Sequence, residues 1–500
     1  MVRLFNTKTR KVEEFVPLEG KKVGMYSCGP TVYSSPHVGN LRAYVFVDIL
    51  RRTLETAGYE VTHVMNITDV GHLFEEGDQA RIGEDKLEYE AEKEKVSAWD
   101  IAKKYIDEFF KNLDALNIRR PTVVPRATDH IQEQIQLIKT LEEKGYTYKI
   151  EDGIYFDTSK FPKYGDFAGG KEGIKAGARI EVVVGKRHPT DFALWKFSPR
   201  PGTSAMSSVP NGSGQTKRQM EWESPWGVGF PGWHIECSAM SLEYLGDAFE
   251  DGTFRGERSR TIDIHTGGID HVPVHHTNEI AQSESATGKE FVRYWLHNEF
   301  VLVDGKKMSK SLGNVYTLQD VTARGFSPLA LRYLFLTTHY RDKLNFTWES
   351  LKAAQNAYDR LVDFVRAEKF SREAGSRSVG QSIEKYREEF TSQMNNDLGT
   401  PAALSVVWKI LKSNIPNQDK QELLFSFDEV LGLNLRAVSV PRVSRVPREI
   451  KELVEEREKL RKEGKWKEAD KIRKEIEEMG YVIDDTEKGP IVKAKKTLSI

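Results

Sequence analysis

The sequence predicts an α/β fold in which a parallel sheet is split by a long insertion and followed by an all-α region and a small C-terminal helical hairpin. Two observations carry this prediction. Short apolar runs that end at glycine turns occur in two well-separated parts of the chain, and apolar residues at helical spacing dominate the last third. At 500 residues the chain is also too long for one hydrophobic core, and about 150 residues per domain indicates about three domains.

The N-terminal part contains a predicted strand, helix and strand in succession. Residues 23–27 form a short apolar-rich run that ends at Cys28 in a Gly-Pro turn, which is typical of a strand. From Leu41 apolar residues repeat at helical spacing until Gly58, and residues 61–68 then have the pattern of a second strand. Such a unit contains parallel strands, so the sequence predicts a Rossmann-type, nucleotide-binding sheet.

The remaining segments complete this architecture. Residues 119–230 have the character of an insertion, and within it residues 198–220 are rich in Ser, Pro and Gly, which predicts a mobile loop. A strand-like run at residues 261–264 leads into a glycine turn and would complete the first sheet. From Glu349 the apolar spacing becomes helical, and two charged helices on either side of Gly464 form the predicted hairpin.

Composition narrows the class of protein. Hydrophobic residues make up 39% and charged residues 30%, as in folded globular proteins. No apolar run approaches the roughly 20 residues that a membrane span needs, and the polar N-terminus lacks the apolar stretch of a signal peptide. We therefore expect a cytoplasmic protein without membrane contact. A formal net charge of -1 gives no global attraction to nucleic acid, so any such binding would use local patches.

The turn between the first predicted strand and helix could bind phosphate. Backbone amides at a helix N-terminus point outward with the positive end of the helix dipole, and His37 and Asn40 would add donors for ATP oxygens. Gly39 would allow close approach of the nucleotide. A lone histidine at such a turn is more often a cap or a surface residue, so this segment needs support from elsewhere.

A second segment supplies positive charge. Lys307 and Lys310 lie in a Lys/Ser-rich loop between Gly305 and Gly313. A loop of this kind can close over a triphosphate and neutralise the charge that builds on its oxygens. Taken alone, the segment could equally be a solvated turn.

The chain has only two cysteines, Cys28 and Cys237, and each could be an inert buried thiol. His275 and Glu279 are four residues apart on a helix predicted to begin near Pro273, which places both on one face. Two thiolates, an imidazole and a carboxylate suit zinc. Three further histidines lie close in the sequence: His265, His271 and His276. Helical spacing does not separate His275 from His276.

Together, the segments at residues 37–40 and 307–311 resemble the signature pair of class I aminoacyl-tRNA synthetases. Within that class, nearly the whole chain is similar to the cysteinyl-tRNA synthetase family. The strings that carry this similarity are Cys28-Gly29-Pro30-Thr31-Val32-Tyr33, Asn66-Ile67-Thr68-Asp69-Val70, Asp191-Phe192-Ala193-Leu194-Trp195-Lys196, the run from Pro231 to Met240, and His275-His276-Thr277-Asn278-Glu279. Several strings run six residues or longer, so the match is specific.

The resemblance implies an activity and its partners. Such an enzyme activates L-cysteine with ATP and magnesium, and transfers it from cysteinyl adenylate to cysteine-specific tRNA. It acts as a monomer. Neither step demands a protein nucleophile, so positioning and charge stabilisation would carry most of the rate. An apolar pocket discriminates cysteine from serine poorly, so we expect a zinc-thiolate bond to provide the selectivity.

The resemblance also implies residue roles. It selects His275 among the histidines and implies one zinc ion per chain, held by Cys28, Cys237, His275 and Glu279. The residues expected to bind ATP are His37, Asn40, Gly268, Asp270 and Lys310, and those expected to act in catalysis are His37, Asn40, Lys307 and Lys310. Thr68 and Trp233 would border the cysteine, although Trp233 could equally be a core aromatic.

The combined patterns divide the chain into six predicted regions. They are residues 1–118, the first half of a Rossmann-type catalytic domain; 119–230, a connective insertion with the loop 198–220; 231–298, the second catalytic half; 299–348, a signature-loop and tRNA stem-contact region; 349–440, an all-α anticodon-side bundle; and 441–500, a small C-terminal domain with a charged helical hairpin.

The chain departs from the family pattern at three places. Asn40 stands where the family usually has a second histidine, Gly71-His72-Leu73 replaces the usual acidic and basic residues, and the stretch 198–220 looks inserted. Asn40 can still donate a hydrogen bond to phosphate, so we expect altered activity rather than none.

Two other functions fit parts of the sequence. An ATP-dependent ligase that joins cysteine to a sugar-type amine would use the same catalytic half, but such enzymes lack a long helical region like that after Glu349. A non-catalytic zinc protein of synthetase descent would tolerate Asn40, but both phosphate segments and the four metal ligands are retained.

Overall fold

The computed structural model describes residues 1–71, 85–170, 173–174, 183–198, 218–309, 312–367, 380–439, 448–486 and 489–494. Lys310 and most of the predicted loop 198–220 lie outside these residues. None of the described helices is long and apolar enough to span a bilayer.

A four-stranded parallel sheet forms the centre of the molecule. Its order is β12-β11-β3-β4. The strands are β3 (Lys22–Ser27), β4 (Glu60–Met65), β11 (Ile262–Gly268) and β12 (Val292–Asn298). Two strands precede the insertion and two follow it, which confirms the predicted split sheet. The strand order reverses between β3 and β11, and ligands of open α/β sheets bind beyond the carboxyl ends of the strands at such a point.

Helix α1 (Val38–Thr56) crosses from β3 to β4 as the apolar spacing predicted. Its apolar residues, among them Leu41 and Leu54, are buried against the sheet and the helices of the second half. The helix ends before Gly58, whose φ of +91° is a left-handed conformation that glycine adopts without strain.

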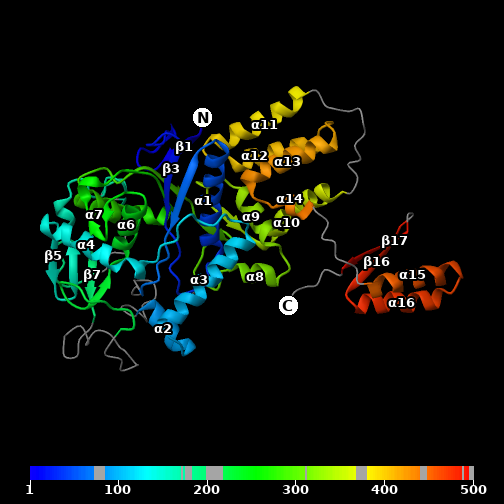
Figure 1. Ribbon diagram of the computed structural model, residues 1–500, viewed down its shortest axis with the longest axis horizontal. Coiled ribbons are helices and arrows are strands. Elements are labelled where there is room, and N and C mark those ends of the chain that lie inside the picture. The colour runs from blue at the N-terminus through cyan, green and yellow to red at the C-terminus, as the bar shows by residue number, and fades with distance from the viewer. Residues whose placement is uncertain are drawn as a thin grey trace.

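The insertion forms an antiparallel sheet of its own, in the order β5-β6-β7-β8. These strands are β5 (Thr147–Ile150), β6 (Gly153–Phe156), β7 (Phe192–Phe197) and β8 (Gly229–Pro231). They share a hydrophobic core with α4 (Ile131–Glu143), α6 (Trp233–Tyr244) and α7 (Thr277–Thr287). In Figure 1 this group lies at one end of the molecule, and α1 separates it from the helical bundle.

Helices dominate the rest of the chain. They are α8 (Leu318–Ala323), α9 (Pro328–Leu336), α10 (Trp348–Arg366), α11 (Gly380–Asn395), α12 (Thr400–Lys412), α13 (Asn417–Leu431) and α14 (Leu435–Ser439), with α2 (Lys86–Glu94) and α3 (Ala98–Ala115) before the insertion. The apolar positions predicted for α10 are all buried, which confirms the helical region.

The C-terminal part contains the predicted helix pair, α15 (Arg448–Lys462) and α16 (Trp466–Glu478). It also contains an antiparallel pair that we did not predict, β16 (Tyr481–Thr486) and β17 (Gly489–Ala494). β16 contains two aspartates, which are uncommon in strands, so its sequence did not predict a strand. One of them, Asp485, accepts a hydrogen bond of 2.8 Å from Arg457 of α15. This unit lies beside the bundle, at the end opposite the insertion sheet (Figure 1).

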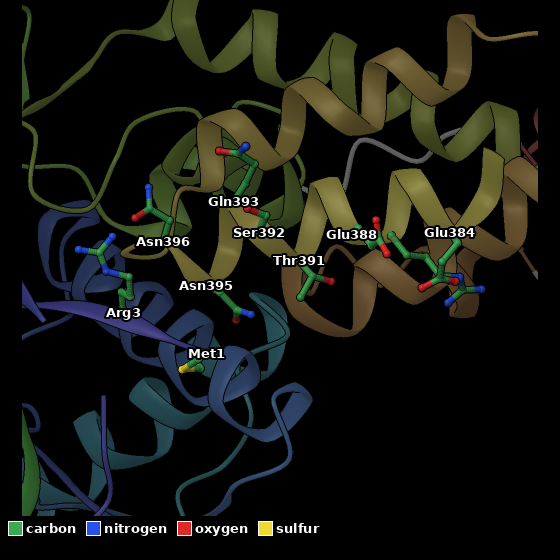
Figure 2. A pocket seen from close by; sticks show the side chains of 10 residues that line it. Met1, Arg3, Glu384, Glu388, Thr391, Ser392, Gln393, Asn395 and Asn396 are labelled. Atoms are coloured by element: carbon green, nitrogen blue, oxygen red, sulfur yellow. The ribbon is translucent and has the colours of Figure 1, made fainter. Parts of the chain in front are cut away.

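Short strands complete the fold: β1 (Arg3–Asn6), β2 (Lys11–Glu14), β9 (Phe249–Glu250), β10 (Thr253–Phe254), β13 (Val301–Val303), β14 (Lys306–Lys307) and β15 (Leu344–Phe346). β1 and α11 border a polar groove of about 750 Å³ (Figure 2). Met1, Arg3, Glu384 and Glu388 are among its lining residues, and none of the predicted site residues lines it.

A buried ionic cluster connects α1 to the helical bundle. Both Arg52 and Arg332 donate to one carboxylate oxygen of Asp48, at 2.7 and 2.5 Å. Arg332 also donates to the carbonyls of Leu116, after α3, and Leu431, at the end of α13. The side chains of Asp48 and Arg332 are fully buried, so these contacts are protected from water and salt.

Arg332→Met should lower the free energy of unfolding by about 3–5 kcal/mol, because it removes one partner of a buried charge pair and leaves buried carbonyls without donors. Urea denaturation followed by circular dichroism measures this. Arg120→Gln, which breaks the exposed pair with Asp114, is the matched control and should have a much smaller effect. Equal losses in the two variants would contradict a special role for the buried cluster.

Candidate active site

The carboxyl edge of the central sheet brings together residues from three distant parts of the chain. Cys28 follows β3 directly, and its backbone N–H donates to the carbonyl of Thr266 on β11 at 3.2 Å. Cys237 lies on α6, and His275 and Glu279 lie on the segment that follows β11. Residues from both halves of the split sheet therefore meet at this edge.

The four predicted metal ligands do converge. One ligand atom from each of Cys28, Cys237, His275 and Glu279 lies within 4.8 Å of every other. Both cysteines are free thiols. His275 Nε2 lies 2.8 Å from a carboxylate oxygen of Glu279, as their predicted spacing requires. The backbone there differs from the prediction, because residues 272–276 form a π-helical turn and α7 begins only at Thr277.

Burial makes this group unfavourable without a cation. Glu279 is fully buried, and its carboxylate oxygens lie 2.8 Å from His275 Nε2 and 3.6 Å from His265 Nε2. Burial raises the pKa of the Glu279 carboxyl and of the Cys28 thiol well above their ordinary values. A bound cation reverses this preference by stabilising the anionic forms. The residues present therefore fit a metal site.

A second, overlapping group contains two of the three further histidines that the sequence left as candidates. Cys28 and Glu279 also lie within 4.8 Å of ligand atoms on His265 and His276. Burial lowers the pKa of both imidazoles well below the ordinary value, so these rings are neutral. His271 belongs to neither group. The sequence left His275 and His276 unresolved by spacing alone, and in the structure both approach the same thiol and carboxylate.

His37 and Asn40 form a reciprocal cap at the start of α1. His37 Nδ1 accepts hydrogen bonds from the backbone amides of Gly39 and Asn40 at 3.1 and 3.2 Å. The Asn40 side-chain oxygen accepts from the His37 amide at 3.1 Å. His37 therefore caps the N-terminus of α1, which was one of the two roles considered for it. This cap is compatible with phosphate binding. Because Nδ1 of His37 accepts hydrogen bonds, the ring proton lies on Nε2, and Nε2 can donate to a phosphate oxygen.

The two segments expected to hold ATP lie against each other. A Cβ added to Gly39 would lie 2.6 Å from Cε of Met308, and the amide of Val38 donates to the carbonyl of Tyr316 at 2.8 Å. Lys307 is exposed at the end of β14. Lys310 lies outside the described residues. Residues almost 270 positions apart thus line one end of the crevice.

The remaining predicted residues occupy the same edge. Gly268 ends β11, and a Cβ there would clash with the carboxylate of Asp270, which is exposed. Thr68 is buried and accepts a hydrogen bond of 3.1 Å from Asn66. Trp233 is only partly buried, and its ring centroid lies 4.2 Å from that of His275. Trp233 therefore borders the ligand cluster instead of lying in the core.

Sequence reasoning missed several neighbours. His234 Nδ1 lies 2.9 Å from His275 Nδ1. His297, on β12, forms a hydrogen bond with His276, and Thr7, which follows β1, forms one with His297. The run from Pro231 to Met240 contains His234 and was a signal for it, but no sequence pattern distinguished His297 or Thr7.

Comparisons with known proteins agree with this geometry. The family model described as "tRNA synthetases class I (C) catalytic domain" matches residues 14–356, and that described as "Cysteinyl-tRNA ligase anticodon binding domain" matches residues 444–490. The chain is 46% identical to "Cysteine--tRNA ligase 1" of Burkholderia lata, over 97% of this chain and 95% of that protein. It is 43% identical to the "Cysteine--tRNA ligase" of Treponema denticola, over 97% and 98%.

Solved structures support the fold. Mycobacterium tuberculosis methionyl-tRNA synthetase in complex with methionyl-adenylate covers 85% of this chain and 92% of its own, with a TM-score of 0.53 and 15% identity. The split parallel sheet and the matched catalytic model define a class I aminoacyl-tRNA synthetase. Within that class the chain belongs to the cysteinyl-tRNA ligase family. It is accordingly an ATP-dependent aminoacyl-tRNA ligase, as the sequence predicted.

Gly39→Ala should raise the KM for ATP by roughly a few-fold, because the added methyl group displaces the end of the Met308 side chain that packs against this turn. Initial rates of ATP–pyrophosphate exchange at varied ATP measure this. Met308→Ala removes the clashing atom, so Gly39→Ala should cost less when introduced into that variant. Strictly additive effects in the double variant would contradict contact between the segments.

Proposed function

We propose that this enzyme activates L-cysteine with ATP and transfers it to the 3′ end of cysteine tRNA. The observation that carries the proposal is the convergence of the only two cysteines with His275 and Glu279 beside the nucleotide crevice. The printed names of the relatives supply the amino acid.

We propose that Cys28, Cys237, His275 and Glu279 hold one zinc ion. The fully buried carboxylate of Glu279, close to ligand atoms of both cysteines and of His275, supports a resident cation. Bound there, zinc would supply a soft Lewis acid that prefers a thiolate to a hydroxyl. An apolar pocket alone separates such similar side chains by only about 10- to 200-fold. Thr68 and Trp233 would border the amino acid, and Trp233 would exclude water from the cluster.

The nucleotide would lie across the N-terminus of α1. His37 Nε2 and the Asn40 amide group would donate to phosphate oxygens while their other atoms cap the helix. Asp270 would accept from the ribose hydroxyls, with Gly268 allowing close approach. Lys307 and Lys310 would neutralise charge on the triphosphate, which carries magnesium as a substrate complex.

Two transfers would follow. The cysteine carboxylate attacks the α-phosphate of ATP, the bond to pyrophosphate breaks, and cysteinyl adenylate forms. The terminal ribose hydroxyl of tRNA then attacks the adenylate carbonyl, and AMP leaves. The residues named above orient the substrates and stabilise charge in both steps, and none of them becomes covalently modified.

We propose a role for each region of the chain. Residues 1–118 and 231–298 form the catalytic domain, 119–230 the connective insertion, 299–348 the region that contacts the tRNA stem, 349–440 the anticodon-side bundle, and 441–500 a C-terminal domain. The match of residues 444–490 to an anticodon-binding model supports tRNA as acceptor over a sugar-type amine. We propose a monomer that acts in the cytoplasm.

Two assays test the proposal. Cysteine-dependent ATP–pyrophosphate exchange should occur without tRNA, and a transcript with the cysteine anticodon should be charged. Exchange without charging would favour a small-molecule acceptor. No exchange, with retained tRNA binding, would favour a non-catalytic protein.

Cys237→Ser should lose bound zinc and most of the preference for cysteine over serine, because one of the two soft ligands is removed. Metal analysis of purified protein, together with the ratio of kcat/KM for cysteine and serine in the exchange assay, measures both effects. His271→Asn is the matched control, since His271 lies near the cluster but in neither ligand group. A zinc-free variant that still prefers cysteine by orders of magnitude would rule the mechanism out.

A further inference from the structure

Three hydrogen bonds connect the N-terminal hairpin to Cys28. Thr7 Oγ1 lies 2.8 Å from His297 Nδ1. His297 Nε2 lies 2.7 Å from His276 Nδ1, and His276 Nε2 lies 3.3 Å from Cys28 Sγ. Each imidazole therefore uses both of its nitrogens, and the chain of contacts runs from a hydroxyl at the edge of the protein to a predicted metal ligand.

The two imidazoles are shielded from water. His276 is fully buried and His297 is 4% exposed. Trp295 packs against both rings, at centroid distances of 4.9 and 6.4 Å. Burial lowers the pKa of His297 to about 3, and the same removal from water disfavours a positive charge on the His276 ring. Each ring is thus neutral, with one N–H and one lone pair.

These facts determine the direction of every hydrogen bond once Cys28 is a thiolate ligand. A thiolate has no proton to donate, so His276 Nε2–H must donate to Sγ. His276 Nδ1 is then an acceptor and requires Nε2–H of His297. His297 Nδ1 in turn accepts, which leaves the Thr7 hydroxyl as its donor.

The backbone holds Thr7 in place for this role. Thr7 follows β1, and its amide donates to the carbonyl of Trp295 on β12 at 2.8 Å. The preceding side chain, Asn6, donates to the carbonyl of Arg293 at 3.0 Å and accepts from the amide of Trp295 at 3.1 Å. The hydroxyl is thereby directed at His297, two residues further along β12.

We propose that Thr7 is a positioning residue for the metal site: its hydroxyl selects the tautomers of His297 and His276, so that an N–H, and not a lone pair, faces Cys28. The inference depends on the proposed zinc site. Outer hydrogen bonds of this kind orient metal ligands and tune their donor strength.

Loss of the hydroxyl has two possible consequences, and both are unfavourable. If the tautomers stay, His297 Nδ1 becomes a buried acceptor without a donor. If both rings switch, a lone pair on His276 Nε2 faces the thiolate. The first arrangement leaves the metal-bound state with an unsatisfied buried acceptor, and the second disfavours the anionic form of Cys28, so both weaken metal binding.

The test compares Thr7→Val, which has nearly the same shape but no hydroxyl, with Thr7→Ser, which keeps the hydroxyl. Zinc affinity is measured by chelator competition on the full-length protein, and the sulfur-to-metal charge-transfer band is recorded after substitution with Co²⁺. Thr7→Val should bind zinc about tenfold more weakly and shift the band, and its KM for cysteine should rise while that for ATP does not. Thr7→Ser should stay within about twofold of wild type.

Several outcomes would overturn the inference. Wild-type affinity and an unshifted band in Thr7→Val would do so, as would equal losses in Thr7→Val and Thr7→Ser, since the hydroxyl would then not be the cause. Complete loss of zinc in His276→Gln would identify His276 as a ligand and reverse the deduced direction. Thermal unfolding of each variant separates these results from a folding defect.

Failure of the proposed function has a different signature. Wild-type protein that binds no zinc, or Cys237→Ser that binds it normally, would reject the metal site itself whatever the Thr7 variants do. Normal zinc binding by wild type, with no response to Thr7→Val, would reject only the role of Thr7.

Discussion

The parallel pairing of β3 with β11 is the contact on which the rest of this structure depends. It joins Met25, Tyr26 and Ser27 to Ile264, His265 and Thr266, across more than two hundred residues of intervening chain. The insertion between them forms its own antiparallel sheet, and its core is shared with α6, α7 and residues of β11 and β12, so folded structure and not a free loop closes this long connection. Because parallel strands place their carboxyl ends at one edge, Cys28 and the glycine turn after β11 must meet there.

This pairing creates a site that is costly to bury. A carboxylate, the Cys237 thiol and several imidazoles are buried beside α6 and α7, and burial opposes the charged form of the Glu279 carboxyl. Groups of this kind persist where function requires them. A cation with affinity for sulfur and nitrogen resolves the conflict, since it stabilises the charged forms that burial opposes.

Helix α1 connects this site to the rest of the enzyme. Its first turn is capped by His37 and Asn40 at the nucleotide end of the crevice, and its middle carries Asp48, which pairs with Arg52 and Arg332. Through Arg332 the same helix contacts the end of α13 in the bundle. One rigid element thus connects the turn capped by His37 and Asn40 to the helical bundle.

The sequence by itself determined the strand, helix and strand around Cys28, the helix α10 and the charged pair α15 and α16, because each depends on an apolar spacing that is local. It also pointed to the four ligands, through the spacing of His275 and Glu279 and the family resemblance. Only the tertiary structure decided that His265 and His276 reach the same thiol, that Met308 contacts Gly39, and that Thr7 reaches His297. These contacts join residues far apart in the chain, and no local pattern encodes which distant atoms a backbone will bring together. The hairpin of β16 and β17 escaped prediction for a related reason, since its acidic strand is stabilised by an arginine on a neighbouring helix and not by an alternation of its own.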